Sequence, residues 1–147
     1  MDWKSEAVDK LKQYEAKQQA LESIPLEIAQ VESTMTSIRS ARTDGVAVKG
    51  SGGSGREDML LNCIVHKDEL QRNLDRTQMW VDSVDGALSV LKPDDRHILE
   101  RMYIYSEAKA IERLMDEYGV VEPSGMYKRI KKAVRKFTIA LYGVVES

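Results

Sequence analysis

The stretch from Arg56 to Leu91 constrains the fold most, because its apolar residues follow a seven-residue repeat that no proline interrupts. Such a helix would span about 50 Å, so its apolar stripe needs partner helices along most of its length. Eight of the ten stripe positions are apolar, and the two polar exceptions either fix the register or lie at the margin of the seam. The ten positions are Leu60, Cys63, Lys67, Leu70, Leu74, Thr77, Val81, Val84, Leu88 and Leu91.

The N-terminal residues offer the nearest partner, since apolar side chains recur there every three or four residues from Ala7 to Ile38. Pro25 lies inside this pattern, and proline lacks the N–H that a helix interior requires. With Ser23 as an N-cap, we expect one helix over about 3–21 and a second over about 24–41. The predicted fold is therefore an all-α chain whose first ninety residues form an antiparallel, coiled-coil-like stalk.

The predicted stalk has three parts: N-terminal helices over 1–42, a loop over 43–55 and the long helix over 56–91. The loop contains five of the nine glycines, which favour a flexible connection, and GSGGSG also resembles an engineered linker. The two N-terminal helices together offer a length comparable to that of the long helix, but Pro25 breaks them, so pairing within one chain should leave apolar surface uncovered. We therefore expect a homo-oligomer that forms through the stalk.

Residues 92–147 differ in composition, because six of the nine aromatic residues lie there and favour a small globular core. Proline, serine and glycine at expected helix ends predict three helices, over about 93–104, 106–118 and 124–142. Ser106 and Ser124 are the expected N-caps, and Gly119 is expected to end the middle helix. Three short helices in this order are typical of a helix-turn-helix domain.

The last predicted helix is strongly basic. Residues 124–147 carry six cations against Glu146 alone, a net charge of +5, so the other 123 residues carry −7 of the total of −2. A basic segment in an acidic chain is either a solvated helix face or a contact for an anionic partner, and double-stranded DNA is the first candidate. Helical projection places Tyr127, Ile130, Val134, Phe137 and Leu141 on one face. The predicted DNA-binding residues are Ser124, Lys128, Arg129, Lys131, Lys132, Arg135 and Lys136.

The segments LKPDDRHILERMYI and SGMYKRIKKAVRKF resemble the region-four DNA-binding domain of sigma factors. The layout of the whole chain is similar to the RinA/ArpU-type late transcriptional regulators of phages and prophages. That resemblance implies DNA binding by the last helix and control of virion or packaging genes, with RNA polymerase as a further candidate partner. The alternatives are a terminase small-subunit-like DNA-packaging protein and a coiled-coil adaptor that does not bind DNA.

An enzyme is not expected from this sequence. His66 and His97 have no cysteine or glutamate at metal-ligand spacing, and GSGGSG lacks the lysine and hydroxyl residue of a phosphate-binding loop, so we expect neither metal nor cofactor. Asp94 and Asp95 follow a proline, which favours a role in the first turn of a helix. The lone Cys63, an N-terminus that is charged from its second residue and the lack of a long apolar run predict a cytoplasmic protein without a membrane partner. The resemblance to phage and prophage regulators implies that this cytoplasm is that of a bacterial host.

Overall fold

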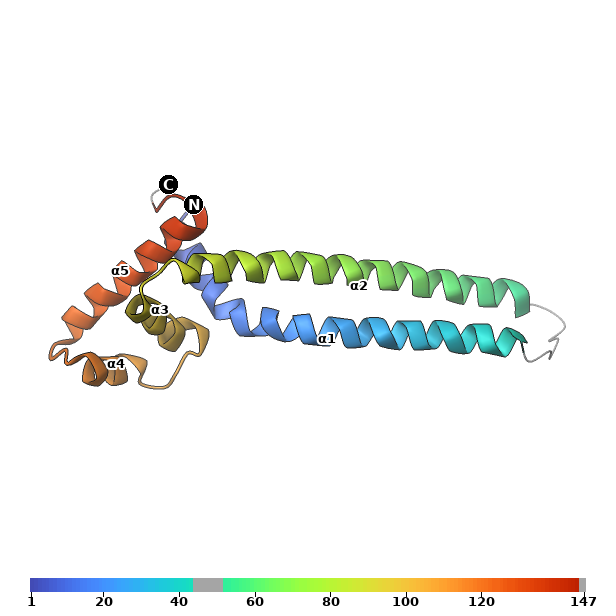
Figure 1. Cartoon of the computed structure of the whole chain (residues 1–147), viewed down its shortest axis with the longest axis horizontal. Helices are drawn as coiled ribbons and strands as arrows, with labels where there is room; N and C mark the ends of the chain where they lie inside the picture. Colours follow the sequence, from blue (N-terminus) through green and yellow to red (C-terminus); the bar gives the residue numbers. More distant parts are fainter. Residues whose placement is uncertain (44–51, 146–147) are drawn as a thin grey trace. The chain divides into compact units, whose positions relative to one another are not determined.

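The all-α fold class is confirmed. The computed structural model describes residues 1–43 and 52–145, and within these ranges every regular element is helical (Figure 1). No helix among them is long and apolar enough to cross a membrane. The elements in chain order are α1 (Trp3–Thr43), α2 (Gly52–Ser89), α3 (Pro93–Leu99), the π-helical segment η1 (Glu100–Ile104), α4 (Ala110–Tyr118) and α5 (Pro123–Tyr142).

Helix α1 runs through Pro25 without a break, so the predicted division into two helices and the N-cap role of Ser23 are wrong. A proline removes one backbone hydrogen bond, at a cost of about 3 kcal/mol in a helix interior. The proline ring lies on the exposed side of the helix, and the stripe residues before and after it, Leu21 and Ile28, are half-buried, so the apolar stripe continues through this position. Tertiary packing of the apolar face, more than local propensity, therefore determines the extent of α1.

Helix α2 begins at Gly52 and ends at Ser89, rather than covering 56–91. Of the predicted loop over 43–55, Thr43 belongs to α1 and residues 52–55 belong to α2; positions 44–51 lie outside the described residues. Glycine disfavours a helix by about 1 kcal/mol per residue but does not forbid one. Extending a long helix adds one hydrogen bond per residue, which favours this one extra turn.

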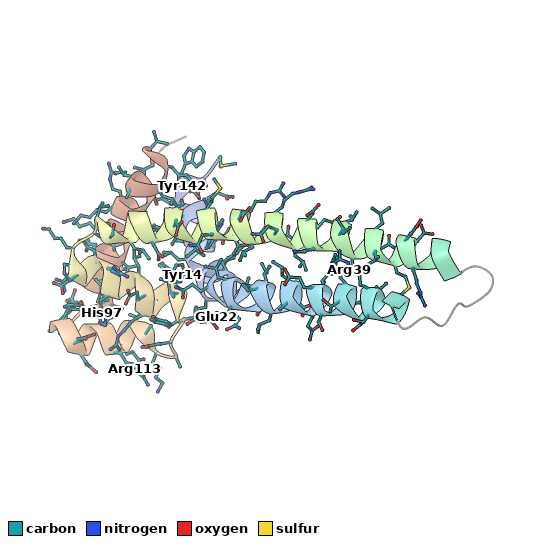
Figure 2. All side chains as sticks on the ribbon, turned by 45° about the vertical axis from the view of Figure 1, so that its right-hand side comes forward. Tyr14, Glu22, Arg39, His97, Arg113 and Tyr142 are labelled. Carbon is teal, nitrogen blue, oxygen red and sulfur yellow. The ribbon has the colours of Figure 1, made fainter. Side chains whose placement is uncertain are left out.

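Residues Gln19–Gln78 form one compact unit, in which α1 and α2 lie side by side and run in opposite directions (Figures 1 and 2). Val31, Met35 and Ile38 of α1 are buried, whereas the stripe residues of α2 are half-buried. Lys67 interrupts that stripe by pairing its Nζ with Glu32 Oε1 of α1 at 2.9 Å. This ion pair joins the two helices at one register.

The second compact unit comprises Met1–Gln18 and Met79–Ser147, so it contains one end of each long helix together with α3, η1, α4 and α5. The predicted boundary at residue 92 therefore does not coincide with the division seen in the structure. Leu11 of α1 and Leu88 of α2 are completely or almost completely buried in the same cluster as Phe137 of α5. The other fully buried large side chains of this unit are Ile98, Leu99, Leu114, Met126, Val84 and Thr138.

Two backbone positions shape the connection before α4. Ser106 and Lys109 both have positive φ, at 46° and 56°, and α4 begins at Ala110 rather than at the predicted residue 106. The predicted N-cap role of Ser106 is wrong, because its hydroxyl donates backwards to the carbonyl of Tyr103 at 3.2 Å. The predicted helix over 93–104 is α-helical up to Leu99 and continues as the π-helical η1.

Candidate nucleic-acid interface

Helix α5 carries the predicted DNA-binding residues. It begins at Pro123, whose fixed φ suits the first helical position, and it ends before Gly143, which has a φ of 79°. Ser124 is therefore inside the first turn and is exposed, and its predicted N-cap role is wrong because Glu122 occupies that position without a side-chain cap.

The buried face of α5 differs from the predicted one by about one residue at its start. Ile130, Val134 and Phe137 are buried as predicted, but Tyr127 is 50% exposed and Met126 takes its place in the core. Sequence projection also missed Ala133 and Thr138. These are a small residue and a polar one, so apolar periodicity gave no signal for them; the Thr138 hydroxyl donates to the Val134 carbonyl at 2.6 Å.

All six predicted cations of α5 are exposed, but they fall into three groups. Lys128, Lys132 and Arg135 lie opposite the buried face, and within the described part of the chain they form no ion pair or hydrogen bond. We call these three residues the central basic face. Their charges are neither neutralised nor desolvated, so they remain available to an anionic partner.

Two other cations are engaged within the protein. The Arg129 guanidinium lies over the Tyr118 ring of α4, 4.8 Å from its centroid. Lys136 Nζ pairs with Asp95 Oδ2 in the first turn of α3 at 2.9 Å. These contacts bind α5 to its neighbours on one side, so Arg129 and Lys136 orient the helix more than they offer charge to a partner.

The remaining cation, Lys131, lies on the side of α5 that faces α1. It lines a groove together with Lys4 and Lys12 of α1. Neither lysine of α1 was predicted from the sequence to belong to the site, because the separation in sequence gives no sign that the start of α1 lies beside α5. At the other end of this contact, the rings of Trp3 and Tyr142 pack with their centroids 4.9 Å apart (Figure 2 labels Tyr142).

Helix α4 precedes α5 and packs against it, but its surface is acidic. Glu112, Asp116 and Glu117 are exposed on it. Residues 119–122 join the two helices, and Gly119 adopts the left-handed conformation, with a φ of 66°, that ends α4 as predicted. Arg113 is the one cation of α4 itself, and its side chain is 60% exposed, so most of the positive surface of this helix pair lies on α5.

A set of polar contacts holds α3, η1 and α4 together. His97 Nε2 lies 3.0 Å from Glu117 Oε2, and Arg101 pairs with Glu107 at 3.3 Å (Figure 2 labels His97). The Tyr118 hydroxyl donates to Asp94 Oδ1 at 3.4 Å, and burial, followed by the Asp94 charge, raises the pKa of that tyrosine. Asp94 and Asp95 lie in the first turn of α3, where they accept bonds from neighbouring helices.

Groups of side chains that could hold a metal ion are absent from residues 1–43 and 52–145. Comparisons of the chain with protein-family models, with curated protein sequences and with solved structures give no match.

Proposed function

We propose that the protein binds double-stranded DNA through the central basic face of α5. The observation that carries the proposal is the exposure of Lys128, Lys132 and Arg135 on one side of a helix whose other side is buried in the core. An exposed helix fits the major groove of B-DNA, and lysine and arginine contact phosphates and guanine edges there. The contacts of Arg129 and Lys136 support the proposal, since they hold the helix in one orientation.

As a biological role, we propose a non-enzymatic transcriptional regulator of phage or prophage genes that acts in the bacterial cytoplasm. The support is the resemblance of the C-terminal segments to sigma-factor region four and of the layout to RinA/ArpU-type regulators. RNA polymerase remains a candidate partner. A map of the DNA sites that the protein occupies in a bacterial genome tests this role: sites upstream of late or packaging genes support it, and occupancy confined to packaging-initiation sites favours the terminase-like alternative.

The test of DNA binding is a gel-shift titration of the Lys128→Glu, Lys132→Glu double variant. Both residues are exposed, so the variant should keep the melting temperature of the wild type and lose affinity for a duplex. The matched control, Arg72→Glu with Arg76→Glu, makes the same change of charge at exposed positions of α2. The assignment of DNA binding to the central basic face would be refuted by an equal loss of affinity in both double variants. It would also be refuted if the Lys128→Glu, Lys132→Glu variant lost no affinity.

The salt dependence of binding separates DNA from an acidic protein partner. If the three residues of the central basic face each neutralise one phosphate, the slope of log K against log salt is about −2.7 from these contacts alone. The double variant should lower its magnitude by about 2. An unchanged slope would place the phosphate contacts elsewhere.

We further propose that the unit formed by Gln19–Gln78 carries self-association. Two helices alone leave the α2 side of the seam half-buried, and Leu61, Ile64 and Val65 of α2 are 58%, 42% and 49% exposed. Burying such apolar side chains against a second copy would stabilise a dimer by the hydrophobic effect. Leu61→Lys with Val65→Lys should give a monomer in analytical ultracentrifugation at tens of micromolar, whereas a wild type that is already monomeric there would contradict the proposal.

A further inference from the structure

The groove between α1 and α5 is a separate feature of the unit that contains the C-terminal helices. Its volume is about 420 Å³, which is within the range of small-molecule sites. Its floor is apolar: Ile130 and Val134 of α5 are 3% and 7% exposed, and Val8 of α1 and Tyr103 of η1 are half-buried. A groove of this volume with an apolar floor can take the body of a small organic molecule, with one face of that body against the floor.

The rim of the groove is cationic. Lys4 and Lys12 come from α1 and Lys131 from α5, and all three side chains are exposed. Asp9 is the acidic residue on the rim, so the groove has an excess of two positive charges. Among the described residues, none of these three lysines forms an ion pair. The floor attracts an apolar group, and the rim attracts an anion beside it.

We propose that this groove binds a small amphipathic anion, an aromatic or aliphatic body that carries a carboxylate, sulfonate or phosphate. The body would pack on Val8, Ile130 and Val134 while the anionic group contacts the lysines. DNA phosphates need only the cations, and the apolar floor therefore favours a small molecule over a nucleic acid. If the proposed function holds, a ligand at Lys131 would also change DNA affinity, because Lys131 lies beside the central basic face.

The test uses 8-anilinonaphthalene-1-sulfonate, an aromatic anion, added to the full-length chain without DNA. Its fluorescence should rise with saturation at one site per chain, and the methyl NMR signals of Val8, Ile130 and Val134 should shift in parallel. The uncharged analogue N-phenyl-1-naphthylamine should bind about tenfold more weakly, because it lacks the charged group that the lysines contact.

Three variants distinguish this groove from other apolar surfaces. The triple variant Lys4→Gln, Lys12→Gln, Lys131→Gln should weaken binding of the sulfonate at least about tenfold and leave the neutral analogue unaffected. Lys10→Gln is the matched control, since it removes a lysine of α1 that lies over Tyr142 and outside the groove, and it should bind normally. Val8→Trp should block binding by filling the groove while every rim lysine remains.

Two results would overturn the proposal. The first is equal binding of the sulfonate by the wild type, the triple variant and the Val8→Trp variant, which would place the probe on another surface such as the Leu61 and Val65 face. The second is a shift of the three methyl signals on addition of a DNA duplex with no response to the sulfonate, which would assign the groove to nucleic acid. Both are independent of the gel-shift test, which changes no groove residue.

Discussion

Leu11→Ala should destabilise α5, although Leu11 lies near the start of α1. Leu11 is 0% exposed and belongs to the same buried cluster as Ile130 and Phe137 of α5. Truncating a fully buried leucine to alanine costs about 2–5 kcal/mol, because it removes apolar burial and leaves a cavity. If α1 and α5 share one core, the whole of that cost is transmitted to the C-terminal helices.

Native-state hydrogen exchange measures the effect at individual amides. For amides of α5 that exchange only through unfolding of this core, a loss of 2–5 kcal/mol lowers protection by about 30-fold to several thousand-fold. Leu26→Ala is the matched control, since Leu26 is also on α1 but is 69% exposed, and it should cost less than about 0.5 kcal/mol. Unchanged protection around Phe137 in the Leu11 variant would refute the shared core and favour an independent domain over residues 92–147.

Three further results are expected. The Tyr14 hydroxyl donates to Asp85, and burial, followed by this hydrogen bond, raises the pKa of Tyr14 to about 12. Because a tyrosine in the unfolded chain ionises near pH 10, the contribution of Tyr14 to stability is fully present below pH 10 and is lost between pH 10 and 12. In thermal melts, Tyr14→Phe should make that loss of stability shallower. Gly119→Ala should cost about 1–2 kcal/mol in denaturant unfolding, because an added Cβ meets no atom there but must adopt a φ of 66°, and Gly119→Asn should cost less. Lys67→Met should change stability by less than about 1 kcal/mol, since the ion pair with Glu32 is only partly buried; a larger loss on chemical denaturation would contradict this account of the seam.

The sequence predicted the inward faces of the two long helices well. None of the ten stripe positions from Leu60 to Leu91 is exposed, because a strict repeat over many turns leaves little freedom in which face is buried. The helix ends were predicted less well. Packing of the apolar face outweighs the local preference of Pro25, and the backbone hydrogen bonds of a longer α2 outweigh those of Gly52, Gly53 and Gly55. The buried faces follow from local periodicity, whereas the helix ends depend on interactions beyond the residues at those ends.

The candidate site was only partly predictable for the same reason. Exposure of the α5 cations followed from helical projection, but their division into three groups depends on distant partners. Asp95 forms an ion pair with Lys136, and the Tyr118 ring contacts the Arg129 guanidinium. Lys4 lines the same groove as Lys131. Local periodicity contains no information about such long-range pairs, and α5 touches helices on two sides, which made its buried face broader than the predicted stripe.

An NMR titration of the full-length chain with a DNA duplex of about 20 base pairs tests the central claim most directly, because it locates the contact without a substitution. The account predicts that the largest backbone amide shifts fall on the exposed side of α5, around Lys128, Lys132 and Arg135, and that the signals of Leu61 and Val65 on α2 stay unchanged at low salt. Shifts confined to residues 19–78, or no shifts at micromolar concentrations of duplex, would contradict it.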